Sequence, residues 1–206
     1  DGPHETPEFL DSGVPFVSAE AVSSGKVDFN KIRGFISESD NDKYSKKYFP
    51  MKNDIFMVKS GATTGVTAIV ESDTKFNIWS PLAVIRCNES SSPHYVLNFL
   101  RSLNFQEAIR LYWSFGTQQN IGMGVIENIR ITRPPLHEAE AIASEIFKKS
   151  IVFEKIISKA ENIINLLIER RTALISSTVK GKIDVRNWQP PKQIENQPLD
   201  NKVVTA

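Results

Sequence analysis

The 206-residue sequence is poor in cysteine and contains no long apolar run. Cys87 is the only cysteine, which excludes an internal disulfide and any zinc site built from several thiolates. No apolar stretch approaches the roughly 20 residues that a helix needs to cross a bilayer, and residues 1–25 lack the pattern of a signal peptide. These absences, with a hydrophobic content of 40%, predict a globular cytoplasmic protein with no membrane association.

The sequence also lacks the motifs of common enzyme classes. It contains no G-x-x-x-x-G-K-[ST] phosphate loop, no G-x-G-x-x-G fingerprint and no G-x-S-x-G nucleophile elbow. His4, His94 and His137 are far apart, and none has a second His or a Cys at metal-ligand spacing. We therefore expect this chain to hold neither a catalytic residue nor a metal ion.

A metal-dependent nuclease is one alternative. The carboxylates of Asp54 and Asp73 could bind Mg²⁺, with Lys75 beside them, if the fold brought all three together. Two acids and a lysine at such loose spacing occur in most proteins of this size, so the pattern is weak.

The net charge is small, but the charged residues are unevenly distributed along the chain. The formal net charge is +1, and residues 1–25 hold five acidic residues and no Lys or Arg. This balance is low for a nucleic-acid-binding protein, which more often has a pI above about 9. A local cluster of lysines could still contact phosphates, or could simply face solvent. The cluster consists of Lys43, Lys46, Lys47, Lys52 and Lys59.

Residues 1–135 have the pattern of a mixed α/β domain. Pro93, with Ser92 as its cap, can begin a helical stretch over 93–113, and 115–124 has the composition of a loop. Short β-branched runs bounded by Gly, Ser or Asp predict strands. These runs lie at 14–18, 32–37, 55–59, 66–70, 81–86 and 129–132.

Residues 137–179 predict one long helix, because the segment has no Pro or Gly. At 1.5 Å per residue it would span about 65 Å. The chain has no second long helix to cover its apolar stripe, so we expect a second copy or a larger partner to do so; packing back on residues 1–135 is the alternative. The stripe follows the three- and four-residue steps of a coiled-coil seam. It includes Ile142, Ile146, Phe153, Ile156, Ile163, Leu167 and Leu174.

Beyond the helix, Gly181 is suited to a C-cap and KIDVR (182–186) predicts a short strand. Residues 189–206 are rich in Pro, Gln and Asn and predict a disordered tail. The domains are therefore expected at 1–135, 136–188 and 189–206.

Five segments resemble, in order, the specificity (S) subunit of type I DNA restriction-modification systems: GVPFVS, NDIFMVKSGATTGVTAIV, SPLAVIR, FGTQQNIGMGVIENIRITRPPLHEAEAIA and LLIERRTALISSTVKGKIDVR. The resemblance runs from about residue 1 to 188. It implies an α+β target-recognition domain that reads double-stranded DNA, followed by a conserved spacer helix. It also implies a non-catalytic role beside a methyltransferase (M) subunit and a restriction (R) subunit. S-adenosylmethionine, ATP and Mg²⁺ would belong to those partner subunits.

The chain departs from this family in two ways. Full-length members have two recognition domains and two spacer helices, whereas this chain has one of each. It also begins at DGPHETPEF, where members usually have an upstream segment, so a truncated N-terminus and a naturally shorter one both stay open. A half-length subunit would have to form a homodimer to rebuild the two-domain arrangement, in agreement with the uncovered apolar stripe.

If the resemblance holds, the KSGATTG and GTQQN segments are candidate DNA contacts. Glycines at 61 and 65 would let backbone N–H groups approach a phosphate, while Gln and Asn can bond bidentately to adenine. The alternatives are an ordinary hairpin turn and internal capping by Gln118 or Asn120. A coiled-coil adaptor with no DNA role also stays open. The candidate DNA-binding residues are Lys43, Lys46, Lys47, Lys59, Ser60, Thr63, Thr64, Thr117, Gln118, Gln119 and Asn120.

Overall fold

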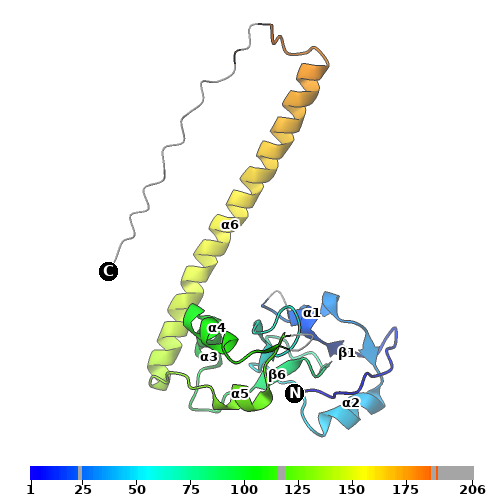
Figure 1. Cartoon of the computed structure of the whole chain (residues 1–206), viewed down its shortest axis with the longest axis vertical. Helices are drawn as coiled ribbons and strands as arrows, with labels where there is room; N and C mark the ends of the chain where they lie inside the picture. Colours follow the sequence, from blue (N-terminus) through cyan, green and yellow to red (C-terminus); the bar gives the residue numbers. More distant parts are fainter. Residues whose placement is uncertain (23–24, 116–118, 187–188, 190–206) are drawn as a thin grey trace. The chain divides into compact units, whose positions relative to one another are not determined.

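The computed structural model describes residues 1–22, 25–115, 119–186 and 189 (Figure 1). The chain divides into two units, Asp1–Lys149 and Ser150–Ala206, and helix α6 (Leu136–Val179) runs from the first into the second. This mixture of helices and small sheets with a long C-terminal helix confirms the predicted α+β class. The first unit includes the initial turns of α6, whereas the sequence predicts a domain boundary at residue 135.

The strands of the described residues form three small sheets. Their orders are β2-β1-β5, β4-β3-β6 and β7-β8. Every pair is antiparallel except β1 with β5, which is parallel. The strands are β1 (Val14–Val17), β2 (Phe35–Ile36), β3 (Ile55–Val58), β4 (Thr67–Ile69), β5 (Asn77–Ile78), β6 (Leu82–Ile85), β7 (Ser114–Phe115) and β8 (Gln119–Asn120).

Strand β3 is the middle strand of its sheet, and all four of its residues are buried. Because side chains alternate across a strand, its two faces enter two different apolar clusters. Phe56 and Val58 belong to a cluster that β1, β5 and helix α1 (Ala19–Val22) also line. Ile55 and Met57 instead pack with helices α3 (Pro93–Arg101) and α4 (Leu103–Arg110). Burial on both faces holds β3 in place. The backbone of Lys59, which follows the strand directly, is therefore held in place as well.

Short helices cover these sheets. Ser102 ends α3 and also caps α4, where its hydroxyl accepts a hydrogen bond from the Phe105 amide. The predicted helical stretch over 93–113 is therefore two helices, and Ser92 caps the first of them as expected. The helices are α1 (Ala19–Val22), η1 (Phe29–Lys31), α2 (Glu38–Ser45), α3 (Pro93–Arg101), α4 (Leu103–Arg110), α5 (Met123–Asn128) and α6.

Two predicted strands are wrong. Residues 129–132 lie in the described range 119–186 but form no strand; Ile129 instead packs on the apolar cluster beside α5. Residues 182–186 also form no strand there, and Arg186 folds back onto the Asp184 carboxylate. Both runs have strand-like composition but find no partner strand within the described range.

Helix α6 ends at a C-cap on Gly181, as the sequence predicts. Gly181 adopts a φ of 68°, and the Lys182 amide donates to the Ser177 carbonyl at 2.8 Å, which is the bond that closes a Schellman cap. The predicted disordered tail at 189–206 lies outside the described residues, apart from Gln189. Among the helices of the described residues, none combines the length and the apolar character that crossing a membrane requires.

Candidate nucleic-acid interface

The turn between β3 and β4 is built on two glycines. Gly61 has a φ of 105° and Gly65 a φ of 93°, in the region where other residues are strained. The Gly65 amide donates to the Val58 carbonyl at 2.8 Å, and the Val58 amide donates to Val66 at 2.9 Å. These bonds close the turn and leave Ser60 and Thr63 half-buried at the edge of the sheet.

The fold joins this turn to the GTQQN segment. The Ile121 amide donates to the Lys59 carbonyl at 2.7 Å, and the Gly61 amide donates to the Gln119 carbonyl at 3.1 Å. Ser60 and Asn120 form an isolated antiparallel bridge. Two motifs about sixty residues apart in sequence thus share one edge of the molecule.

The individual side chains divide into two groups. Thr64 is buried, and its hydroxyl donates to the Gly61 carbonyl at 2.6 Å, so it stabilises the turn and is not available to a ligand. Thr64 therefore fits the alternative that KSGATTG is an ordinary hairpin turn better than it fits a DNA contact. Gln119 is half-buried and Asn120 is exposed, on the surface beside Ser60. Thr117 and Gln118 lie outside the described residues.

Two of the predicted phosphate contacts, Lys43 on α2 and Lys47 just after it, are paired with acids of the N-terminal segment. Lys43 Nζ lies 2.5 Å from Glu5 Oε1, and Lys47 Nζ lies 2.6 Å from Asp1 Oδ1. Lys59 also binds Asp1, with Nζ 2.8 Å from Oδ2. The fold thus gathers lysines from α2 and from the end of β3 around one acidic segment.

Lys46 differs from its neighbours. Its side chain is exposed, and no ion pair is found for it within the described part of the chain. Of the lysines on and next to α2, it is therefore the one whose charge is most available to a phosphate.

The residues of the nuclease alternative do not make a site. The buried Asp54 carboxylate accepts hydrogen bonds from Tyr48 Oη at 2.5 Å, from the Met51 amide at 2.7 Å and from two nitrogens of Arg86. Lys75 instead pairs with Glu38 at 2.5 Å. Among the described residues, no three His, Cys, Asp or Glu side chains form a group that could hold a metal ion. The nuclease alternative thus finds no support.

The Asp54 cluster also perturbs its neighbours. Burial, with the hydrogen bond to Asp54, raises the pKa of the Tyr48 hydroxyl far above its usual value. The same carboxylate raises the pKa of Arg86, whose guanidinium stacks 5.2 Å from the Tyr48 ring centre. Both effects keep Tyr48 neutral and Arg86 charged, as a structural cluster requires.

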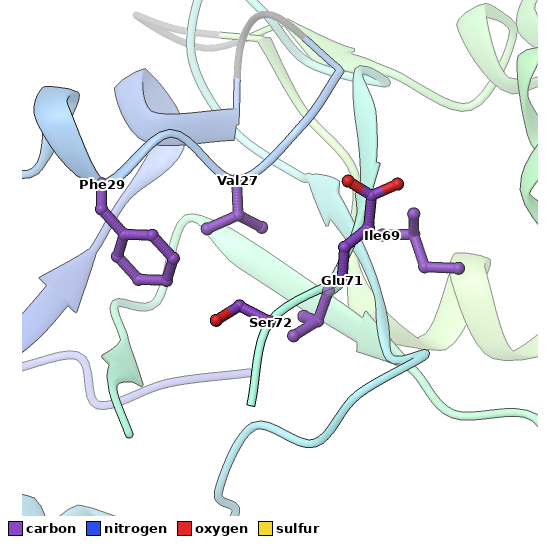
Figure 2. A pocket seen from close by; sticks show the side chains of 6 residues that line it. Val27, Phe29, Ile69, Glu71 and Ser72 are labelled. Atoms are coloured by element: carbon purple, nitrogen blue, oxygen red, sulfur yellow. The ribbon is translucent and has the colours of Figure 1, made fainter. Parts of the chain in front are cut away.

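A cavity of about 300 Å³ lies beside β4. Figure 2 shows Val27 and Phe29 on one segment and Ser72 on another, with the Glu71 carboxylate pointing away from the Phe29 ring. The lining offers one carboxylate and no cation, so we do not place a nucleic-acid phosphate here.

The apolar residues predicted for an interface are exposed on α6. The two buried residues of the helix are Ala139 and Ala143, near its start. The seven predicted interface residues are between 37% and 62% exposed, which is high for apolar side chains in a helix. They are Ile142, Ile146, Phe153, Ile156, Ile163, Leu167 and Leu174.

Residues 4–168 match the family model of the type I restriction modification DNA specificity domain. The chain belongs to this family. One solved structure is described as the structural basis of complex assembly and conformational transition of the type I restriction-modification (R-M) system. It is 20% identical in sequence to this chain, with a TM-score of 0.54. It aligns with 80% of this chain and 39% of its own length.

A second solved structure has the same fold. An HsdS subunit from Thermoanaerobacter tengcongensis is 16% identical, with a TM-score of 0.52 over 91% of this chain and 49% of the subunit. The specificity-domain chain described here thus spans less than half of the length of either structure. No curated protein sequence matches it.

Proposed function

We propose that this specificity-domain chain is the DNA sequence-recognition part of a type I restriction-modification complex and reads one half of a bipartite target. The family match supports this role, and the joining of the KSGATTG and GTQQN segments carries it. Hydroxyl, amide and lysine side chains meet there on one edge, and a protein needs this combination to bind phosphates and base edges together.

The residues of this edge have separate tasks. Lys46, Lys59 and Ser60 bind phosphates, which sets affinity and its salt dependence but not sequence. Gln119 and Asn120 reach base edges in the major groove, where an amide can bond to adenine N6 and N7.

Two copies pair antiparallel through residues 142–175 of α6. A lone helix with this apolar surface is unfavourable in water, and a second copy supplies an identical stripe. The helix is about 65 Å long, so it separates two recognition domains by at most about nineteen base pairs of 3.4 Å each. Identical halves require a palindromic target.

The chain itself carries out no catalysis. An M subunit with S-adenosylmethionine methylates adenine, and an R subunit with ATP and Mg²⁺ cleaves DNA. This chain positions both subunits on the DNA target. The complex works in the cytoplasm. A coiled-coil adaptor without a DNA role is the competing function.

Co-purification with an M subunit, followed by fluorescence anisotropy on labelled duplex DNA, tests this proposal. A DNA-reading subunit gives salt-dependent binding that exceeds that of the M subunit alone. An adaptor gives co-purification with no added DNA affinity, and that result would reject the recognition role.

A further inference from the structure

One carboxylate collects three basic side chains at the edge of the recognition domain. Asp1 Oδ1 lies 2.6 Å from Lys47 Nζ, and Asp1 Oδ2 lies 2.8 Å from Lys59 Nζ and 3.4 Å from His4 Nε2. The side chains of Asp1 and Lys59 are only 11% and 12% exposed. The contact between Asp1 and Lys59 is therefore largely removed from solvent, whereas the side chains of Lys47 and His4 are 62% and 72% exposed.

The backbone beside Asp1 is held in place. A Cβ on Gly2 would lie 2.2 Å from the Ile78 carbonyl oxygen, so no larger residue fits there. The Ser80 amide donates to the Pro3 carbonyl at 3.2 Å. Because these contacts anchor the segment to β5 and the residues after it, the Asp1 side chain can leave the lysines without unfolding the segment.

The lysines need an anion between them. Burial and the charge of Lys47 lower the pKa of the Lys59 ammonium, which shows that the two cations repel each other in a partly dry place. A carboxylate oxygen relieves this repulsion, and a phosphate oxygen would do so equally well. Lys59 also directly precedes Ser60, so the anion lies next to the edge where the two sequence motifs meet.

We propose that Lys47, Lys59 and His4 form a binding site for one backbone phosphate of DNA, which the Asp1 carboxylate occupies in the free protein. DNA must displace Asp1 to use the site. The tethered carboxylate therefore lowers the affinity for every sequence alike, and weak binding to non-target DNA follows. This inference rests on the proposed DNA-recognition function.

The test compares Asp1→Asn with Glu8→Gln in the full chain. Both variants remove one negative charge from the same segment, but Glu8 is exposed and has no ion pair among the described residues. Binding of a 30-base-pair duplex is measured by anisotropy at several salt concentrations. Asp1→Asn should bind about threefold to tenfold more tightly, because DNA no longer has to displace a carboxylate from the site. Glu8→Gln should change the affinity less than twofold, because its charge is distant and screened.

A double-mutant cycle identifies the site. Lys47→Gln should remove most of the affinity that Asp1→Asn gains, whereas Lys75→Gln, which breaks the separate Lys75–Glu38 pair, should leave that gain intact. Inorganic phosphate at matched ionic strength is the probe for a free anion.

If inorganic phosphate stabilised Asp1→Asn against unfolding as much as DNA does, the assignment to a DNA phosphate would be overturned.

Two results separate failure of this inference from failure of the function. If wild-type protein binds DNA and Asp1→Asn binds no better than Glu8→Gln, the carboxylate is only a structural clamp and the inference is wrong. A lower Tm for Asp1→Asn without a gain in affinity leads to the same conclusion. If neither wild type nor any variant binds DNA, even with the M subunit, the proposed function itself fails.

Discussion

Arg86 holds both oxygens of the buried Asp54 carboxylate, with Nε 2.7 Å from Oδ1 and Nη2 2.8 Å from Oδ2. Arg86 follows β6 and Asp54 precedes β3, so this two-point pair locks the ends of two neighbouring strands. Tyr48 and the Met51 amide use the remaining acceptor capacity of the carboxylate. The same strand β3 places Lys59 at its other end, which makes the pair part of the support of the DNA-binding edge.

Asp54→Asn should lower the free energy of unfolding by about 2 kcal/mol. Removing one partner of a fully buried pair costs roughly 3–5 kcal/mol, and the value is smaller here because the Arg86 side chain is 44% exposed. Urea denaturation measures the change. Asp73→Asn is the control, since Asp73 is 82% exposed and should change stability by less than about 0.5 kcal/mol. Equal stability of the two variants would contradict the structural role of Asp54.

Ser60→Ala and Thr64→Val should separate binding from folding. Thr64→Val removes the buried bond to the Gly61 carbonyl and should cost about 1 kcal/mol of stability. Ser60→Ala should leave the Tm nearly unchanged but weaken DNA binding about fivefold, because it removes a hydroxyl donor to phosphate. Thermal melts and anisotropy measure the two effects. If Ser60→Ala left DNA binding intact, Ser60 would not be a contact.

Lys46→Gln should weaken binding to every DNA sequence by a similar factor. Loss of one phosphate contact reduces the slope of log affinity against log salt by about 0.9. Lys52→Gln is the matched control, because Lys52 lies 3.7 Å from Asp73 and is outside the proposed interface. Equal salt slopes for the two variants would remove Lys46 from the interface.

The sequence predicts the long helix and the main strands well, since both have strong local signals. The helix begins at Leu136, one residue before the predicted start, and ends at Val179 as expected. Strands β3, β4 and β6 also lie where β-branched runs predict them. In each case periodicity or composition is sufficient, because the burial of the element follows directly from its own residues.

Elements that depend on distant contacts could not be predicted. Helix α2 (ESDNDKYS) is polar, and it is recognisable only by its cap at Ser37, whose hydroxyl accepts from the Asp40 amide. Its buried Asn41 is held by Asn77, far along the chain. Composition alone favoured a strand at 129–132, but a strand needs a partner, and none lies beside it among the described residues.

The candidate site shows the same limit. The sequence supplies the residue types of KSGATTG and GTQQN, but not the hydrogen bond between Ile121 and Lys59 that joins them. It also gives no sign that Asp1 binds Lys47 and Lys59, because ion pairs between distant residues leave no local pattern.

Replacing Ile156, Ile163 and Leu167 with Asp should dissociate the proposed dimer. Three charges would then lie in the paired apolar seam, where neither water nor a partner charge could stabilise them. Ser158→Asp, Asn162→Asp and Asn165→Asp add the same charge to polar positions of the helix and should leave the dimer intact. Sedimentation velocity at micromolar concentration measures both triple variants. A monomeric wild type, or loss of the dimer in both variants, would contradict pairing through the seam.

The modified sequence in DNA methylated by the reconstituted complex of this chain and an M subunit tests the central claim most directly. Two identical copies paired through α6 predict an inverted repeat of one short half-site with a constant gap of at most about nineteen base pairs. Methylation at a single half-site, at two unrelated half-sites or without sequence preference would contradict recognition by a symmetric pair of these chains.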